Sequence, residues 1–487
     1  GDHRDLHSFP TRRSSDLGAK NFLFETLSSD AGILEAVRTL KAAEPDTFVL
    51  VSFAVLPDGY TREGLYCKDL VRRMSESGCV DAVGLNCVSA PGAMRTLARS
   101  LSSALPLSVM PNAGYPVVTR TQVRYQGKPE YFAQELSGLA ADGVVRILGG
   151  CCGTTPAHIA ALRAALDALP ETAAPARTKE FSTPEAKPVE NEDAFLCKLN
   201  AGEKVIAIEL DSPRNADLTA YLEGARKLQA AGADLLTIAD CPIAQARMDS
   251  SLVACRVHRE LGMCTLPHMT CRDRNLNATK ALLLGLYAEG VREVLAITGD
   301  PIPTAERDEV KNVYQFNSRK LAQYIVSLAG EGREMPSAMT VFGALNLNAR
   351  NFEVELRRAG EKLEHGMSGF LTQPVLSGQA VENLRHAREV LGSRARILAG
   401  IMPVVSQRNA VFMENEINGI HVEEDIIRQF AGLDRAQGEE LGLAISLKMA
   451  REALPYADGF YLMTPFNRVA LMERLIARLR TEVLQES

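Results

Sequence analysis

The sequence predicts an α/β protein with two (β/α)8 TIM-barrel-type domains, of which the first is incomplete and the second complete. Short apolar runs alternate with amphipathic stretches along most of the 487 residues, which is the pattern of a parallel sheet covered by helices. Residues 168–195 break this alternation, because they are rich in Pro, Ala, Thr and Glu and have no apolar stripe. They predict an extended linker between two units.

Residues 18–167 form the first predicted unit and supply five strands. The apolar runs are Phe22–Glu25, Phe48–Phe53, Ala82–Asn86, Leu107–Pro111 and Val144–Leu148. A (β/α)8 barrel needs eight strands, so about three βα units are expected to be missing here. An open set of strands exposes its edges, which favours aggregation or an adventitious contact, and we expect a homo-oligomer.

Residues 1–17 stand apart from this pattern. They show no apolar periodicity, no initiator Met and no apolar core of a signal peptide. The stretch from Ser8 to Leu17 resembles a translated sequencing adapter. We therefore expect residues 1–17 to be a non-native artefact, and the chain to be a fragment whose native part starts near Gly18.

Residues 196–487 form the second predicted unit and supply eight strands. The apolar runs are Val205–Glu209, Leu235–Ala239, Thr265–Met269, Val294–Thr298, Met339–Gly343, Gly369–Gln373, Ile397–Ile401 and Gly459–Met463. Helical patterns separate them; one example is Asn277–Glu289, which an Asn opens as a possible cap and Gly290 closes. Eight βα units predict a closed barrel whose chemistry lies at the carboxyl ends of its strands. Polar residues fall at those ends: Glu209, Asp240, His268, Asp300 and Gln373.

Composition excludes several classes of partner. A net charge of −6 and a pI near 5.9 argue against nucleic acid. No apolar run approaches the roughly 18 residues that a membrane span needs. Ten cysteines scattered over so long a chain do not form a small disulfide scaffold, which favours a reduced cytoplasmic setting. We expect small molecules as partners.

Three cysteines follow two of the predicted strands of the first unit. Cys87 comes after Ala82–Asn86, and Cys151 and Cys152 come after Val144–Leu148. Adjacent Cα atoms lie about 3.8 Å apart, below the roughly 4.4 Å minimum usual for a disulfide, so a bond between Cys151 and Cys152 is disfavoured. Three thiolates can hold zinc and leave its fourth position open. The alternative is a set of buried structural cysteines beside a glycine turn.

Asn86-Cys87 followed by the Gly149–Thr154 motif (GGCCGT) resembles the homocysteine S-methyltransferases. The resemblance implies that Cys87, Cys151 and Cys152 bind Zn2+, that homocysteine sulfur takes the open position, and that its thiolate attacks a methyl group. It also implies that Glu25 holds the homocysteine amino group, although a lone carboxylate at a strand end is usually just solvated. The methyl donor stays open between methyltetrahydrofolate and another compound such as S-methylmethionine.

Four motifs of the second unit resemble methylenetetrahydrofolate reductase over residues 200–475. They are Ile208-Glu209, Pro267-His268-Met269-Thr270-Cys271, Thr298-Gly299-Asp300 and Thr372-Gln373-Pro374. Each motif is weak alone, but four in order on successive strands are specific. The resemblance implies a flavin barrel that binds FAD, takes hydride from NAD(P)H as co-substrate and passes it to a folate. The whole layout resembles bifunctional proteins that join both activities in methionine synthesis.

The resemblance also implies a role for particular residues at the barrel mouth. Glu209 matches the acid that protonates the folate, and burial can raise the pKa of such a carboxyl; an ordinary strand-end carboxylate is the alternative. Asp300, with Gly299 before it, matches an aspartate near the flavin and the pterin; the alternative is a helix N-cap. His268 matches a flavin-contacting histidine, and a satisfied core histidine is the alternative.

Two further residues are implied in ligand binding. Gln373 offers a donor and an acceptor to the pterin edge. Lys362 matches a lysine near the FAD phosphates, although an exposed helix lysine is nearly as good an interpretation.

Three departures from the reductase pattern leave the FAD contacts and the choice between NADH and NADPH open. Thr298 stands where the family often has Arg, Leu345 stands near an expected aromatic, and Val405–Asn409 replaces another. No Gly-x-Gly-x-x-Gly fingerprint occurs, so FAD would be held by barrel loops.

Three functions remain in view. The first is a bifunctional enzyme with both activities, whose methyltransferase part is impaired because strands are missing. The second is a reductase alone, with a non-catalytic zinc- or thiol-binding remnant in front. The third is a non-enzymatic module that holds zinc on a barrel scaffold.

Overall fold

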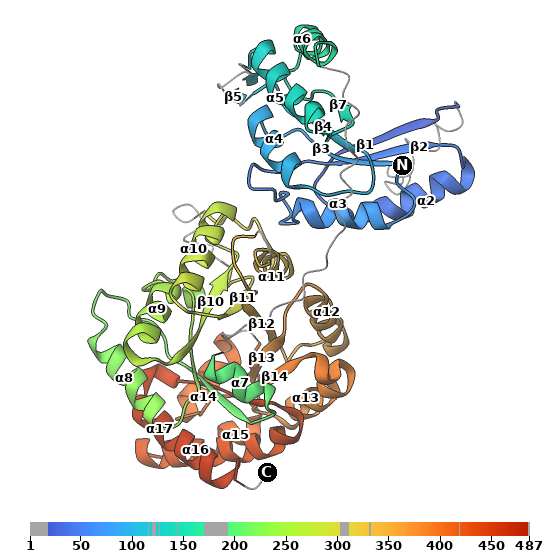
Figure 1. Ribbon diagram of the computed structural model, residues 1–487. Helices are drawn as coiled ribbons and strands as arrows, with labels where there is room; N and C mark the ends of the chain where they lie inside the picture. The colour runs from blue at the N-terminus through green and yellow to red at the C-terminus, as the bar shows by residue number, and fades with distance from the viewer. Residues whose placement is uncertain are drawn as a thin grey trace. The chain divides into compact units, whose positions relative to one another are not determined.

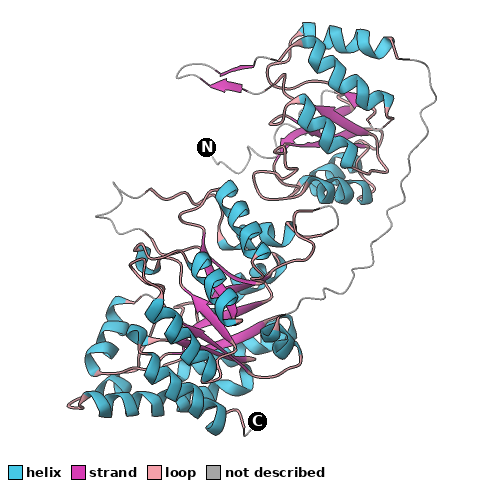
Figure 2. Cartoon of the chain, turned by 60° about the vertical axis from the view of Figure 1, so that its left-hand side comes forward, coloured by secondary structure: helices cyan, strands magenta, loops and turns pink. Residues whose placement is uncertain are grey.

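The computed structural model describes residues 18–114, 116–118, 123–125, 127–143, 145–169, 193–301, 311–330, 333–417 and 419–485. The chain divides into two compact units, residues 1–185 and 186–487 (Figure 1). In each unit the described helices lie outside the strands (Figure 2). The expected artefact at residues 1–17 and most of the predicted linker lie outside the described residues. Within the described ranges, no helix has both the length and the apolarity that crossing a membrane requires.

A parallel five-stranded sheet forms the centre of the first unit. Its order is β1-β2-β3-β4-β7, and the strands are β1 (Asn21–Leu27), β2 (Phe48–Phe53), β3 (Ala82–Asn86), β4 (Leu107–Met110) and β7 (Ile147–Leu148). The helices are α2 (Ile33–Ala43), α3 (Cys67–Glu76), α4 (Pro91–Ser100), α5 (Pro129–Ala141) and α6 (Pro156–Asp167). An antiparallel hairpin of β5 (Pro116–Val118) and β6 (Val123–Tyr125) was not predicted from the sequence.

The burial of the strands follows their place in this sheet. Every residue of the central strand β3 is buried, which suits its apolar run, whereas no residue of β1 is. Leu23 of β1 is 48 % exposed. Because β1 and β7 end the order, each has a strand neighbour on one side only in the described part of the chain. The first unit is therefore an open sheet with edges.

Eight parallel strands close into a barrel in the second unit. They are β8 (Val205–Glu209), β9 (Leu235–Ile238), β10 (Cys264–Thr270), β11 (Glu293–Ile297), β12 (Thr340–Leu345), β13 (Gly369–Pro374), β14 (Arg396–Ile401) and β15 (Gly459–Met463). Neighbours in sequence are neighbours in space, and β15 pairs with β8 to complete the ring. The prediction of one incomplete and one complete barrel-type domain is confirmed.

Helices surround the barrel. They are α7 (Ala194–Asn200), α8 (Thr219–Ala230), α9 (Ser250–Leu261), α10 (Leu276–Ala288), α11 (Ser318–Ser327), α12 (Phe352–Glu364), α13 (Gly378–Leu391), α14 (Gln407–Glu416), α15 (Glu424–Gln429), α16 (Arg435–Ala453) and α17 (Val469–Glu482). The side chain of Asn275 caps α10 by accepting a hydrogen bond from the Ala278 amide at 3.0 Å. The expected cap at Asn277 is therefore wrong by two residues, since Asn277 already lies inside the helix.

Alternate residues of the barrel strands point to its axis and build the core. On β8 these are Val205 and Ala207, and on β15 Tyr461 takes the corresponding place. Helix α7 adds Phe195 and Leu199 to the same core, beside the first residues of several strands. It therefore closes the barrel at the end where the strands begin and leaves the carboxyl ends for the site.

Candidate functional site

The three predicted zinc ligands of the first unit lie together. The sulfur atoms of Cys87, Cys151 and Cys152 are all within 4.8 Å of one another, and those of Cys87 and Cys152 are 3.6 Å apart. Two sulfurs bound to zinc at about 2.3 Å in tetrahedral geometry would be roughly 3.8 Å apart. The thiols are half-buried to exposed, so a ligand from solvent can reach them. Their geometry fits a zinc site with one open position.

Two turns bring these thiols to one point. Cys87 and Val88 both adopt left-handed backbone conformations, with φ of 56° and 59°. Such a conformation is costly for a β-branched residue, and it is found mainly where function requires it. After β7, Gly153 has φ 78°, and a Cβ there would lie 2.3 Å from the Cβ of Tyr125. Only glycine fits this position, which explains the last glycine of the motif.

The amide of Asn86 connects the thiols to the first strand. Its Nδ2 donates to the Thr26 hydroxyl at 2.8 Å, and its Oδ1 accepts from the Thr26 amide at 2.8 Å. The same Nδ2 lies 3.5 Å from Glu25 Oε2 and 3.9 Å from the sulfur of Cys151. Asn86 is fully buried and holds the end of β1, and with it the exposed Glu25, beside the thiol cluster.

Without a metal the thiol of Cys151 holds its proton. Burial, and next the hydrogen bond and charge of Cys87, raise the pKa of Cys151 to about 12. A divalent cation among three sulfurs reverses this balance, because it stabilises the thiolates directly. The cluster is therefore suited to bind a cation, and Cys151 is ill suited to act as a free nucleophile at neutral pH.

Three of the predicted site residues point into the mouth of the barrel. Glu209, His268 and Gln373 each lie at or near the carboxyl end of a strand, at positions of the same alternation as the core residues. His268 Nε2 is 3.7 Å from Glu209 Oε2. Among the described residues, none hydrogen-bonds the side-chain amide of Gln373. The barrel thus presents an acid, an imidazole and an unpaired amide to its mouth.

Glu209 has the properties of a proton donor. Burial, and next the charge of Asp211, raise the pKa of its carboxyl to about 7. The hydroxyl of Tyr461 donates a hydrogen bond to Glu209 Oε2, which lowers that pKa, as does Arg247. Arg247 lies 3.0 Å from Asp211 Oδ2. The carboxyl is therefore close to half-protonated at neutral pH, unlike an ordinary strand-end carboxylate.

His268 is neutral. Burial lowers the pKa of its imidazole to about 4, and the side chain is only 7 % exposed. Its Nε2 is buried and makes no hydrogen bond within the described chain. The alternative of a satisfied core histidine does not fit this orphaned nitrogen, whereas a ligand in the mouth could bond it.

Asp300 lies on a turn after β11. Gly299 has φ 91°, and a Cβ there would lie 3.0 Å from Thr270 Cβ, so the turn needs glycine. Arg272 donates to the Asp300 carbonyl at 3.0 Å. The carboxylate of Asp300 is exposed, and the residues from 302 to 310, on which its helix N-cap alternative depends, lie outside the described residues.

The carboxylate of Asp240, also predicted at a strand end, does not face the mouth as a free group. Its Oδ2 accepts hydrogen bonds from the Thr270 amide and hydroxyl, both at 3.0 Å, and from Arg274 at 2.6 Å. Arg274 also binds Asp249 at 2.7 Å. Asp240 is therefore a buried structural partner that holds the ends of β9 and β10 together.

A cationic pocket of about 490 Å³ lies beside the turn at Gly299 and Asp300, between α11 and α12. Its lining combines four basic and two acidic side chains with three polar ones: Arg319, Arg357, Arg358 and Lys362; Glu355 and Glu361; Thr298, Asn317 and Ser318. Lys362 is only 15 % exposed and donates to the Ala344 carbonyl at 2.6 Å. The alternative of an exposed helix lysine is therefore wrong.

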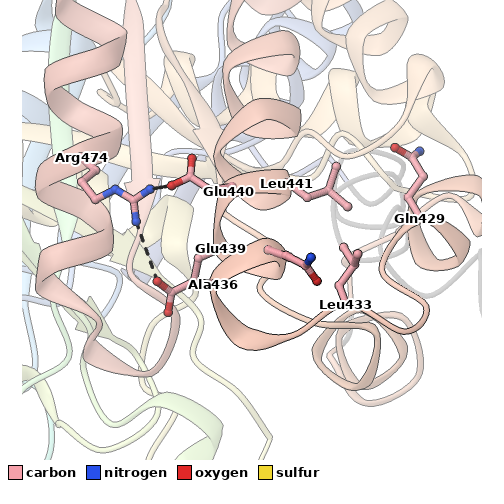
Figure 3. A pocket seen from close by; sticks show the side chains of 8 residues that line it. Gln429, Leu433, Ala436, Glu439, Glu440, Leu441 and Arg474 are labelled. Atoms are coloured by element: carbon pink, nitrogen blue, oxygen red, sulfur yellow. Dashed lines mark hydrogen bonds and ion pairs between the residues drawn. The ribbon is translucent and has the colours of Figure 1, made fainter.

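A pocket of about 670 Å³ belongs to the outer surface of the barrel (Figure 3). It lies among α15, α16 and α17, and Figure 3 shows Arg474 reaching toward Glu439 and Glu440 at one side of it. None of the predicted site residues lines it. Its walls come from helices rather than strand ends, so we assign it no part in the chemistry.

Several functional candidates had no signal that we recognised in the sequence. Tyr461 and Arg247 act on Glu209 from 252 and 38 residues further along the chain, and Asp211 acts on it from the loop directly after β8. Arg319 lines the same pocket as Lys362 from another helix. The alternation of inward and outward side chains along β15 would have placed Tyr461 on the barrel axis. Nothing in the local pattern distinguishes Arg247 or Arg319 from solvated arginines.

Comparisons with known families agree with the two units. Residues 195–480 match the family model described as methylenetetrahydrofolate reductase, which is more than half of the chain. Residues 3–166 match the model described as homocysteine S-methyltransferase.

Individual relatives match the first unit. The methionine synthase of Mycobacterium tuberculosis is 34% identical over 169 residues, covering 34% of this chain and 14% of that protein. The homocysteine S-methyltransferase of Escherichia coli is 34% identical over 152 residues, covering 31% of this chain and 48% of that protein. The chain therefore spans half or less of the length of these relatives. A solved protein from Clostridium thermocellum that binds two copies of 5-methyl-5,6,7,8-tetrahydrofolic acid aligns with a TM-score of 0.44 at 13% identity, over 59% of this chain and 99% of that one.

Proposed function

The chain belongs to the methylenetetrahydrofolate reductase family, with a segment related to homocysteine S-methyltransferases in front, and we propose that it acts in one-carbon metabolism toward methionine. The barrel reduces methylenetetrahydrofolate to methyltetrahydrofolate with NAD(P)H. The first unit binds zinc and homocysteine, and its capacity to transfer a methyl group is reduced by the open sheet.

The observation that supports the reductase most is the state of Glu209. Its carboxyl faces the barrel mouth with a pKa near 7, and a protonated acid is what the folate needs. The methylene group bridges two nitrogens of the folate, and protonation of one nitrogen lets its C–N bond break, which leaves an iminium carbon. Hydride added to that carbon completes the methyl group, while Glu209 is left as a carboxylate that takes its next proton from water.

The lining of the mouth and of the cationic pocket fits FAD. The pocket beside Gly299 and Asp300 carries four cations against two carboxylates, which suits a diphosphate, and Lys362 and Arg319 belong to it. The orphaned Nε2 of His268 provides a bond for a flavin edge. When bound there, FAD would carry hydride from NAD(P)H to the folate. Gln373 would orient the pterin through its free amide.

The thiol cluster fits zinc by its sulfur separations and by its ligand type, since soft thiolates favour zinc over hard cations. Bound zinc would deprotonate a substrate thiol in its fourth position. Glu25, held beside the cluster through Asn86, would pair with the substrate ammonium group. The second candidate function, a reductase with a non-catalytic thiol remnant, is favoured by the edge strands β1 and β7.

The visible spectrum of the purified protein tests the reductase proposal. We expect flavin absorbance that bleaches when NADH or NADPH is added without oxygen and returns when methylenetetrahydrofolate follows. A protein that remains colourless after FAD is supplied would overturn the proposal. Zinc analysis and formation of methionine from homocysteine then test the first unit. We expect stoichiometric zinc and slow methyl transfer, and the absence of zinc would overturn its assignment.

A further inference from the structure

The turn that follows β15 has an unfavourable backbone conformation. Phe466 has φ 51° and ψ 33°, and Asn467 after it has φ 54°. Two successive left-handed residues other than glycine are rare, and a bulky aromatic is among the least suited to that region. Such strain persists where the surroundings or a function require it.

Burial does not compensate for this strain. The side chain of Phe466 is 69 % exposed, the most of any large apolar side chain in the described chain. The Arg468 guanidinium lies over its ring, 5.9 Å from the ring centroid. Arg468 is in turn bound to Glu439 at 3.0 Å. The turn therefore presents an aromatic face to solvent at a conformational cost.

The position of this turn connects it to the acid at the mouth. Met463, the last residue of β15, is in register with Glu209, and the hydroxyl of Thr464 donates to the Glu209 carbonyl. Phe466 follows two residues later. The ring is thus carried by the rim of the barrel, on a segment fastened to the backbone of Glu209.

We propose that Phe466 is a stacking surface for the conjugated ring system of the folate that Glu209 protonates. The inference rests on the proposed reductase function and deepens it. A flat π-face at the rim suits the aminobenzoyl or pterin ring, and stacking of this kind orients the ring without using a hydrogen bond. The folate is favoured over the nicotinamide because the turn is attached to the acid, and the folate is the reactant that takes its proton.

The sequence offers a direct probe, because the chain contains no tryptophan. Phe466→Trp places a sole indole on the turn of the otherwise intact, flavin-loaded protein. Titration with 5-methyltetrahydrofolate should change its emission in a saturable way. The matched control is Val390→Trp, which is 49 % exposed at the end of α13 and so lies at the opposite end of the barrel. Its emission should change only by light absorption of the added folate.

Kinetics separate stacking from a structural role. Phe466→Ala should raise KM for methylenetetrahydrofolate roughly threefold to tenfold, and more than it raises KM for NAD(P)H. Phe466→Tyr keeps a ring and should restore the KM, whereas a turn that only needed bulk would be restored by Phe466→Leu. Equal KM values in the parent and the alanine variant, or a rise confined to NAD(P)H, would overturn the inference. If the parent protein itself fails to oxidise NAD(P)H with its flavin, the proposed function has failed instead.

Discussion

The thiol cluster of the first unit and the mouth of the barrel are assembled in different ways. The cysteines come from β3 and β7, which flank the single strand β4, and Asn86 at the end of β3 reaches β1. The mouth takes Glu209 from β8, His268 from β10 and Gln373 from β13, which face one another only because β15 pairs with β8.

This difference teaches what closure contributes. A site made by close neighbours in a sheet needs only local turns, so the thiols can gather although the sheet is open. A site made by strands from around a ring needs the ring, and the enclosure also removes water from Glu209. Closure therefore supplies both the arrangement and the raised pKa of the acid.

The largest effect should come from removing the acid of the closed site. Glu209→Gln keeps the shape of the side chain but cannot donate the proton, so folate reduction should fall on the order of 10² to 10⁴-fold. Stopped-flow absorbance would measure flavin oxidation by methylenetetrahydrofolate and, separately, flavin reduction by NAD(P)H. The latter should fall far less. An equal loss in both steps would show that Glu209 holds the flavin rather than protonating the folate.

Removal of one thiol should abolish zinc binding by the cysteine cluster of the first unit without affecting the site at the barrel mouth. Cys151→Ala leaves two sulfurs, and zinc measured by plasma mass spectrometry should fall from about one to below about 0.1 per chain. The control Cys79→Ala removes a half-buried thiol outside the cluster and should keep the zinc. Flavin content should be unchanged in both variants. Full zinc occupancy in Cys151→Ala would refute the three-thiol site.

The pH dependence of folate reduction tests whether enclosure in the barrel sets the pKa of Glu209. Because the proton donor is the protonated form, folate reduction should be constant below pH 7 and fall about tenfold per unit above it. The hydrogen bond from Tyr461 lowers the pKa of Glu209, so Tyr461→Phe should move the descending limb to higher pH. Single-turnover rates from pH 5.5 to 9 would measure both. If the descending limb of the pH–rate profile does not move in Tyr461→Phe, a group other than Glu209 donates the proton.

The smallest expected effect is on stability. It concerns Glu293, whose carboxyl the closed barrel buries at the end where the strands begin. The side chain of Glu293 is fully buried, and burial followed by the charge of Asp193 raises the pKa of its carboxyl well above the ordinary value. No carboxylate is fully buried among the described residues of the first unit. The Glu293 carboxyl takes up a proton on folding, so its contribution to stability is present at low pH and is lost as pH rises.

Glu293→Gln cannot titrate and should therefore gain stability relative to the parent as pH rises, by on the order of 1 kcal/mol. Urea unfolding of the parent and the variant at pH 5.5 and pH 8 would measure the difference. The control Glu382→Gln removes an exposed carboxylate bound by Arg385 and should show no such gain. A constant difference between the two pH values would contradict the assignment.

The sequence alone determined much of the architecture. Apolar runs placed all eight barrel strands to within about two residues at either end, and the five of the open sheet nearly as well. Cysteines and polar residues directly after those runs were correctly expected at strand ends. These features depend on local periodicity and on turns such as that at Gly153, where the sequence itself carries the constraint.

Only the tertiary structure decided what those residues experience. It made Asp240 a buried partner of Arg274, showed Lys362 inside a cationic pocket, and set Tyr461 and Arg247 against the acid. It also revealed the strained, exposed Phe466, two residues after Thr464, whose hydroxyl is bonded to the Glu209 carbonyl. The physical reason is that alternation and turn chemistry act between near neighbours in sequence, whereas burial, ion pairing and a shifted pKa depend on side chains that folding brings from far along the chain.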